Sequence, residues 1–506
     1  MTASSPAAAP PFDPALAARI PYAFAQAHGV LAYARDGESV VVLLRPDATV
    51  DGIAEVRRVL ERPLVTRGVP ADAFAQELAR AYNQGGAGAL VWNDDPARGG
   101  DLARLLQDIP EAEDLLDAGT QAPVIRMINA LLLQALRERA SDLHFEPYEA
   151  RSVVRFRVDG VLRDVIEPPR ALHAALVSRL KIMASLDIAE KRLPQDGRIA
   201  LKLGDKQVDV RVSTLPTGAG ERVVLRLLDK DSARLDLAAL GMSEGTLVQI
   251  DRLIREPHGI VLVTGPTGSG KTTTLYAALS RLPRGTTNMM TVEDPIEYAL
   301  DGVAQTQVNP RIELTFARSL RAILRQDQDV IMIGEIRDLE TAQIAVQASL
   351  TGHLVLATLH TNDAASAVTR LADMGVEPYL LASSLLGVLA QRLVRTLCPT
   401  CRVAAPASPG EAKLMAAVGL PPSQPVWSAA GCAQCNDTGY RGRTGLYELL
   451  VVDDAMRRRI HDGASEPALR DAAAAAGMRT LRTDGARWVA DGTTSLAELL
   501  RVTRDP

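Results

Sequence analysis

The chain has 506 residues, enough for three or four domains with substantial cores. Its 47% hydrophobic and 23% charged content excludes wholesale disorder, and its formal net charge of −5 argues against a general nucleic-acid binder. No apolar run approaches the roughly 18 residues that span a membrane, and the first residues lack a signal-peptide pattern, so we expect a cytoplasmic protein.

The N-terminal part predicts a leader followed by a small mixed domain. Residues 1–14 are rich in Ala, Pro and Ser, which is typical of a disordered leader. The apolar run Val40–Leu44 predicts a strand, and two helical patterns follow it. No residue of segment 15–95 indicates catalysis, so we interpret it as a docking module. A linker is expected at 96–115.

The next domain, expected over residues 116–230, begins with a helical pattern at Pro123–Ala140. Alternating apolar and polar residues then predict antiparallel strands with one face exposed. Arg211 and Arg226 lie on the polar face of these strands. On spacing alone, a solvated strand face is favoured over a functional role for both arginines.

A third domain is expected over residues 231–397. Short, nearly continuous apolar strands alternate with helical segments there. This alternation indicates an α/β fold, with a parallel sheet covered by helices on both faces.

A phosphate-binding loop lies at the start of this third domain. Its sequence, GPTGSGKT, fits the pattern G-x-x-x-x-G-K-[ST], with an apolar strand before it and a helix after it. A glycine-rich turn without function is the alternative, and the flanking elements disfavour it. We expect Lys271 to reach the β- and γ-phosphates of ATP and the Thr272 hydroxyl to hold Mg²⁺. The predicted nucleotide-binding residues are Gly265, Pro266, Thr267, Gly268, Ser269, Gly270, Lys271, Thr272 and Thr273.

Glu335 follows a second apolar strand, Val330–Ile333. The position at which such strands often carry a metal-binding Asp is Gly334 here. We therefore interpret Glu335 as the residue that orients the attacking water. An acidic residue that caps the loop before the next helix is the alternative.

Two further carboxylates and a histidine are expected near the carboxyl edge of the sheet, where α/β folds bind ligands. Glu293 and Glu297 follow another strand and suit the positioning of water or metal. A turn at Pro295 with solvated acids is the alternative. His360 ends a further strand, close to the expected nucleotide.

All four cysteines fall in two C-x₂-C pairs, Cys398 with Cys401 and Cys432 with Cys435. Four thiolates with this spacing can close a tetrahedral, structural Zn²⁺ site. A redox pair is the alternative, but two pairs in a turn-rich segment disfavour it.

Taken together, these motifs resemble those of the secretion-superfamily (traffic) ATPases. The resemblance covers about residues 115–500 and rests on GPTGSGKT, TVEDPIEY, IMIGEIRD, TGHLVLATLHTN and the paired C-x₂-C motifs. Within that superfamily the chain is most similar to the type II secretion ATPases, the general secretion pathway E family. That likeness rests on RFRVDGVLR, DVRVSTLP, GERVVLRLLDK, GYRGRTGLYELL and the N-terminal IPYAFAQAHGVL. Gln328 departs from the pattern, since many members carry Pro there.

The resemblance implies an architecture. It implies a small N1 docking domain, a PAS-like mixed αβ N2 domain and a RecA-like P-loop ATPase core, C1. A zinc-binding segment, 398–440, and a C-terminal helical region, 441–506, would follow. Arg211 and Arg226 would act as arginine fingers toward the γ-phosphate.

It also implies partners and a role. The protein would be a homohexamer that hydrolyses ATP with Mg²⁺ and powers pseudopilus assembly for type II secretion. N1 would dock on the cytoplasmic domain of the inner-membrane L component, with the platform protein F and anionic lipid as further partners. The protein would then be a peripheral protein of the inner membrane that binds no nucleic acid. A type IV pilus assembly ATPase, a RecA-type nucleic-acid motor and a non-hydrolysing scaffold are the alternatives.

Overall fold

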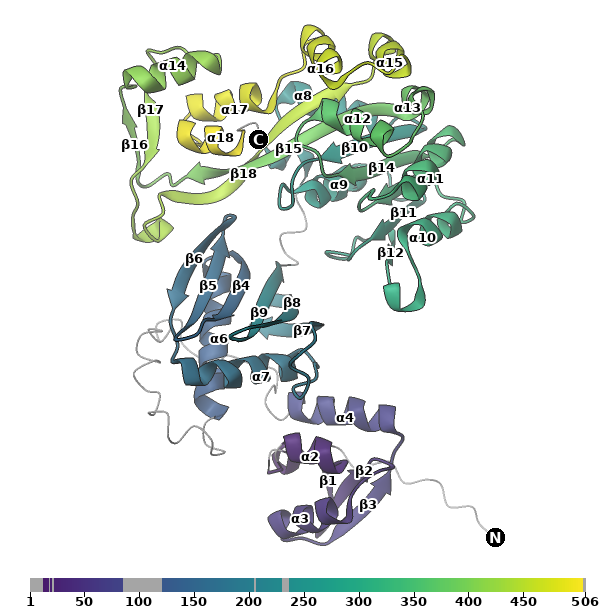
Figure 1. Cartoon of the computed structure of the whole chain (residues 1–506), viewed down its shortest axis with the longest axis vertical. Coiled ribbons are helices and arrows are strands. Elements are labelled where there is room, and N and C mark those ends of the chain that lie inside the picture. The colour runs from purple at the N-terminus through teal and green to yellow at the C-terminus, as the bar shows by residue number, and fades with distance from the viewer. Residues whose placement is uncertain are drawn as a thin grey trace. The chain divides into compact units, whose positions relative to one another are not determined.

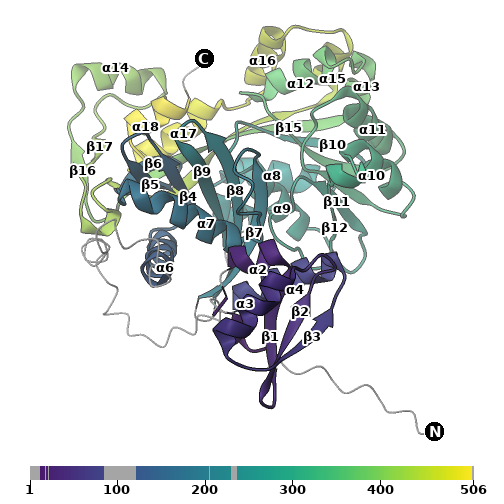
Figure 2. The ribbon, with the colours of Figure 1, turned by 60° about the horizontal axis from the view of Figure 1, so that its bottom comes forward.

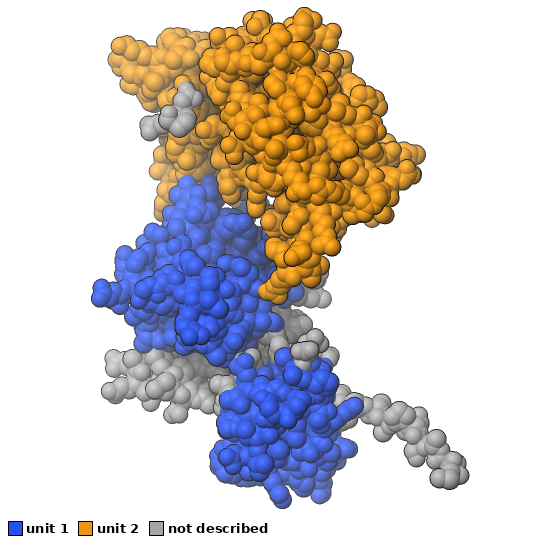
Figure 3. Space-filling model, turned by 45° about the vertical axis from the view of Figure 1, so that its right-hand side comes forward, with its two compact units in different colours: residues 1–230 blue, residues 231–506 orange. Residues whose placement is uncertain are grey.

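The computed structural model describes residues 12–17, 19–20, 22–84, 121–203, 206–229 and 236–503. The chain forms two compact units, residues 1–230 and residues 231–506 (Figure 3). The predicted linker at 96–115 lies outside the described residues. Among the residues that are described, no helix is long and apolar enough to cross a bilayer.

The segment predicted as the N1 domain forms a three-stranded sheet with helices packed on it. Strand order is β1-β2-β3, with β1 antiparallel and β3 parallel to β2. The ring of Phe12 packs on that of Tyr33, and Asp13 pairs with Arg35, so the end of the predicted leader belongs to this domain. The elements are α1 (Pro14–Ala17), α2 (Tyr22–His28), β1 (Val30–Asp36), β2 (Ser39–Leu44), α3 (Val50–Leu60), β3 (Leu64–Gly68) and α4 (Ala71–Gln84).

The segment predicted as the N2 domain forms a six-stranded antiparallel sheet with order β6-β5-β4-β9-β8-β7. Its strands alternate buried apolar and polar residues, as their sequences predict, and α6 and α7 share the core of the apolar face. The elements are α6 (Gln121–Arg137), β4 (Ala140–Pro147), β5 (Ser152–Val158), β6 (Val161–Ile166), η4 (Arg170–Leu172), α7 (His173–Met183), β7 (Gln195–Leu203), β8 (Lys206–Thr217) and β9 (Gly220–Asp229).

A seven-stranded sheet organises the second unit (Figure 1). Its order is β12-β11-β13-β14-β10-β15-β18; β18 is antiparallel to β15 and all other pairings are parallel. The strands are β10 (Gly259–Thr264), β11 (Met289–Glu293), β12 (Ala304–Gln307), β13 (Val330–Ile333), β14 (Leu354–Leu359), β15 (Leu385–Leu397) and β18 (Tyr440–Val451).

Helices cover both faces of this sheet, as the alternation of strands and helices predicts. Alternate residues of β10 enter different cores: Ile260 and Leu262 face one, Val261 and Val263 the other. The helices are η6 (Leu237–Leu240), α8 (Glu244–Leu253), α9 (Lys271–Ser280), η7 (Pro310–Ile312), α10 (Phe316–Ile323), α11 (Leu339–Leu350), α12 (Ala364–Asp373), α13 (Pro378–Ser384), α15 (Asp454–His461), α16 (Glu466–Ala475), α17 (Leu481–Ala490) and α18 (Leu496–Val502).

The region expected to be helical, 441–506, begins instead with a strand, β18. Residues Leu446–Leu450 form a continuous buried run, and such a run does not distinguish a strand from a buried helix. Between β15 and β18 the chain forms an arm (Figures 1 and 2) built from β16 (Arg402–Ala405), α14 (Pro409–Ala417), β17 (Val426–Ala429) and η8 (Ala433–Cys435).

Candidate functional site

The phosphate loop lies between β10 and α9, so the strand and helix that its motif requires are both present. Gly265, Gly268 and Gly270 have positive φ angles of 148°, 79° and 86°. A Cβ atom on Gly265 would lie 2.4 Å from the carbonyl oxygen of Gln391. The loop therefore needs glycine both for its backbone turn and for its close approach to β15.

Polar groups inside the loop fit a bound phosphate. Lys271 Nζ donates to the carbonyl oxygens of Gly265 and Pro266, at 2.7 and 3.1 Å. Burial lowers the pKa of Lys271 to about 8, against an opposing effect of the nearby Glu335 carboxylate. Ser269 Oγ is buried without a hydrogen-bond partner. A cation and a free hydroxyl at a helix N-terminus are what a phosphate oxygen requires.

Lys271, Glu335 and His360 come together from neighbouring strands. They follow the carboxyl ends of β10, β13 and β14, and β14 lies between the other two strands in the sheet. His360 Nε2 lies 2.9 Å from Glu335 Oε1, and Arg337 Nε donates to Glu335 Oε2 at 2.6 Å. The structure thus groups three predicted catalytic residues at one edge of the sheet, and adds Arg337, which our sequence analysis did not single out.

His360 favours its neutral form in this setting. Desolvation lowers its pKa most, Lys271 and Arg337 lower it further, and Glu335 opposes them. A neutral imidazole beside Glu335 donates or accepts one hydrogen bond without adding charge. Such a group suits the ordering of a water molecule.

Glu293 is 2% exposed and sits in a polar network inside the protein. It accepts hydrogen bonds from the Tyr276 hydroxyl, from Thr291 Oγ1 at 2.5 Å and from Gln305 Nε2 at 3.0 Å. These contacts join α9, which carries the phosphate loop, to β11. They account for the burial of Glu293, and its catalytic role stays a prediction.

Glu297, Thr272 and Thr273 are half-buried. Burial, followed by the nearby Glu293 and Glu297 carboxylates, raises the pKa of Tyr298 to about 12. Thr272 and Thr273 occupy the first turn of α9, directly after the loop, and the magnesium role of Thr272 stays a prediction.

The four cysteines gather into one cluster, with their sulfur atoms within 4.8 Å of one another. The Sγ–Sγ distances of Cys398–Cys432, Cys401–Cys435 and Cys432–Cys435 are 3.9, 3.8 and 3.7 Å. Tetrahedral Zn²⁺ with Zn–S bonds of about 2.3 Å separates its ligands by about 3.8 Å. The backbone N–H groups of Cys432 and Gly439 also donate to Cys435 Sγ, both at 3.2 Å, which favours a thiolate. The cluster therefore fits zinc.

The predicted arginine fingers lie in the first unit, on neighbouring strands of the N2 sheet. Arg211 and Arg226 are directly opposite each other across β8 and β9. Arg226 Nε donates to Asp142 Oδ1 at 2.9 Å, while the Arg226 side chain remains 55% exposed. Val210, Val212 and Leu225 turn into the core, so the predicted division of the two faces is confirmed.

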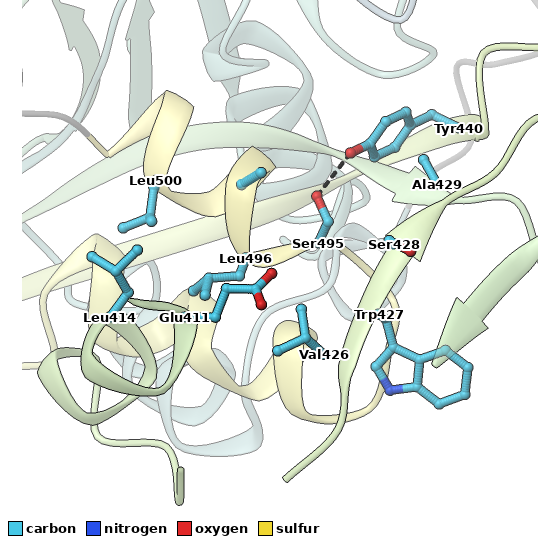
Figure 4. A pocket seen from close by; sticks show the side chains of 11 residues that line it. Glu411, Leu414, Val426, Trp427, Ser428, Ala429, Tyr440, Ser495, Leu496 and Leu500 are labelled. Carbon is cyan, nitrogen blue, oxygen red and sulfur yellow. Dashed lines mark hydrogen bonds between the residues drawn. The ribbon is translucent and has the colours of Figure 1, made fainter. Parts of the chain in front are cut away.

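A cavity of about 480 Å³ lies between the arm and the C-terminal helix α18 (Figure 4). Its lining is mainly apolar, with Leu414, Trp427 and Leu500 among the residues. The Tyr440 and Ser495 hydroxyls, 2.7 Å apart, pair with each other, and Glu411 caps α14 through Ser408. These polar groups are hydrogen-bonded within the protein.

Comparisons with known proteins agree over nearly the whole chain. A family described as "Type II/IV secretion system protein" matches residues 117–501, and the model of an N-terminal domain of "GSPII protein E" matches residues 19–82. The chain is 61% identical to "Type II secretion system protein HxcR" of Pseudomonas aeruginosa over 96% of this chain and 99% of that protein. It is 52% identical to "Type II secretion system ATPase E" of Vibrio cholerae over 96% of this chain and 97% of that protein.

Solved structures are similar in fold. The ATPase DotB of Legionella pneumophila has a TM-score of 0.55 at 20% identity, covering 74% of this chain and 95% of that chain. The pilus retraction motor PilT with bound ADP has a TM-score of 0.51 at 24% identity, covering 74% of this chain and 96% of that chain. The α/β fold with a P-loop core is thereby confirmed.

Proposed function

The chain belongs to the Type II/IV secretion system protein family and is a type II secretion ATPase, and from this we propose that it is the cytoplasmic motor that powers pseudopilus assembly. The observation that carries this proposal is the grouping of Lys271 and Glu335 at the same edge of the sheet, after β10 and β13, beside a loop with an unpaired hydroxyl. The type IV pilus alternative is not favoured, because the relatives carry type II secretion names.

The residues of the site divide the work of hydrolysis. Lys271 and the N–H groups at the start of α9 neutralise the phosphate oxygens as charge develops on them. Glu335, held between His360 and Arg337, orients the attacking water toward the γ-phosphorus. Mg²⁺, which the Thr272 hydroxyl would help to hold, supplies further neutralisation of phosphate charge when bound.

Arg211 and Arg226 complete the site as arginine fingers in this proposal. Both carry a permanent positive charge, and Asp142 orients Arg226 through its Nε while the side chain stays 55% exposed. Closure of N2 on C1 would bring them to the γ-phosphate, and rigid-body motion between these domains would drive the machine. An isolated subunit would then be a poor ATPase.

We expect the ATPase activity to rise when the subunits assemble and when N1 docks on its partner. The protein works as a homohexamer, and N1 docks on the cytoplasmic domain of the inner-membrane L component. The match of residues 19–82 to a domain of GSPII protein E supports a dedicated N-terminal module. The platform protein F and anionic lipid are the further partners, and they hold the protein at the inner membrane.

Phosphate release from the full chain, measured with the cytoplasmic domain of the L component and anionic vesicles, tests this function. We expect a low basal rate that rises at least tenfold when both are added, together with a shift to a hexamer in sedimentation. The chain lacking residues 1–84 is the control and should hydrolyse ATP without responding to the L component. If no condition produced magnesium-dependent phosphate release, the proposed motor function would be overturned.

A further inference from the structure

Gln391 is a polar residue in the middle of the long apolar strand β15. Its side chain is 2% exposed, and the strand pairs with β10 on one side and with β18 on the other. Ala390, the residue before it, pairs with Thr264 at the end of β10, so Gln391 lies beside the point where the phosphate loop begins. Burying an amide there costs free energy unless both of its ends are hydrogen-bonded.

Both ends of the Gln391 amide bond to the phosphate loop and its helix. Nε2 donates to the carbonyl oxygen of Ser269 at 2.7 Å, and Oε1 accepts from Thr274 Oγ1 at 2.7 Å. The orientation of the amide is fixed, because the Ser269 carbonyl oxygen can only accept. Since Thr274 is itself 2% exposed, water does not compete for these bonds.

These two contacts enclose Gly270, the last residue of the loop. Thr274 N donates to the Gly270 carbonyl oxygen at 3.0 Å, so the peptide after Gly270 is held as well. A Cβ atom on Gly270 would lie 3.0 Å from Gln391 Nε2. The Gln391 amide thus packs directly against the backbone of the loop at Gly270.

The planar peptide between Ser269 and Gly270 links the Gln391 contact to the phosphate site. In a trans peptide the N–H points opposite to the C=O of the preceding residue. When Gln391 holds the Ser269 carbonyl, it turns the Gly270 N–H to the opposite side, the inside of the loop. That N–H is one of the donors that a P-loop offers to the phosphate oxygens.

From these contacts we infer that Gln391 is a positioning residue for nucleotide binding, which fixes the Ser269–Gly270 peptide so that the loop is preformed for phosphate. Gln391 touches no substrate and acts through the loop. The inference rests on the ATPase function stated above. Gln391 comes from a strand that lies about 120 residues after the loop in the sequence. The P-loop motif does not include this position.

The chain offers a matched control in Gln328. This glutamine also lies in the second unit, just before β13, and is 4% exposed, but neither of its amide atoms has a hydrogen-bond partner. Replacement by Leu removes a buried amide in both cases. Only Gln391→Leu also removes a bond to the phosphate loop.

Titration of the full-length, zinc-loaded protein with a fluorescent ATP analogue tests the inference. We expect Gln391→Leu to raise the Kd for nucleotide roughly tenfold or more, because an unpaired Ser269 carbonyl no longer orients the loop. In steady-state assays, KM should rise more than kcat falls. Gln328→Leu should leave both within about twofold. Thr274→Val should give a smaller rise in Kd, and it should add little in combination with Gln391→Leu, since the two share one contact.

Gln391→Glu separates positioning from a general loss of packing. An ionised carboxylate cannot donate to the Ser269 carbonyl, but a protonated one can. Relative to wild type, the nucleotide affinity of Gln391→Glu should therefore recover as the pH falls from 8 to 6. Equal nucleotide affinity of Gln391→Leu and wild type would overturn the inference. If wild type itself bound no nucleotide, the proposed function would fail instead.

Discussion

The phosphate loop and the cysteine cluster are connected by one strand, β15, yet they are built in opposite ways. The cluster takes its four sulfur atoms from two short turns, and backbone N–H groups of the same turns support them. The phosphate loop depends on strands from elsewhere: Gln391 shapes it, and Glu335 and His360 face it from β13 and β14. One site is local and stabilises an arm, while the other joins parts distant in sequence and performs chemistry.

This difference implies that the two sites are energetically separate. Seven residues of extended chain, from Gln391 to Cys398, span roughly 23 Å. Perturbations that far apart are expected to add without coupling. Variants of one site should therefore leave the other intact.

The largest effect is expected for Lys271→Ala. The buried ammonium is the charge placed to meet the phosphates, so its removal should abolish measurable turnover and weaken nucleotide binding at least about a hundredfold. Phosphate release and nucleotide titration measure both quantities. Lys413→Ala, at an exposed lysine of the arm, is the matched control. Zinc content should be unchanged in both; a loss of zinc from Lys271→Ala would contradict the separation of the sites.

Glu335→Gln should bind nucleotide but hydrolyse it roughly a hundredfold to a thousandfold more slowly. The amide keeps the shape of the side chain and loses the charge that pairs with Arg337 and orients water. Single-turnover assays compared with nucleotide titration separate the two steps. Asp329→Asn is the control, because Asp329 lies at the other end of β13 and accepts from Asn288 N at 2.7 Å. Unchanged turnover in Glu335→Gln would contradict its assignment as the catalytic carboxylate.

The same difference explains what could be predicted from the sequence. The loop and the cysteine pairs consist of contiguous motifs with fixed spacing, so their residue types alone indicate phosphate and zinc. The grouping of Glu335 and His360 followed from a general rule, that parallel strands bring their carboxyl ends to one edge. Gln391 gave only a weak signal, a polar residue in an apolar run, and its partners depend on the pairing of β15 with β10. The contact of Glu293 with Tyr276 could not be predicted, because it depends on how α9 packs against β11.

At the cysteine cluster, Cys432→Ser should release zinc and lower the melting temperature of the protein by about 5 °C or more. Three remaining thiolates no longer close the tetrahedral site, and the arm loses its cross-link. Nucleotide affinity should change less than about threefold, because the P-loop contacts of Gln391 remain. Elemental analysis, thermal melting and nucleotide titration provide the three readouts, with the exposed Ser428→Ala on β17 as the control. Full zinc content in Cys432→Ser would refute the four-thiolate site.

The smallest effect is a pH dependence confined to the phosphate loop. Burial lowers the pKa of Lys271 to about 8 in the free protein, and bound phosphate favours the ammonium form. Binding must therefore restore a proton near and above pH 8, so nucleotide affinity should begin to fall as the pH approaches 8 and then fall by up to about tenfold per pH unit above it. Lys271→Arg, whose charge does not titrate in this range, should bind more weakly but lose this dependence. An equally steep fall in that variant would assign the titration to another group, and the zinc content of both proteins should stay constant over the same range if the two sites are separate.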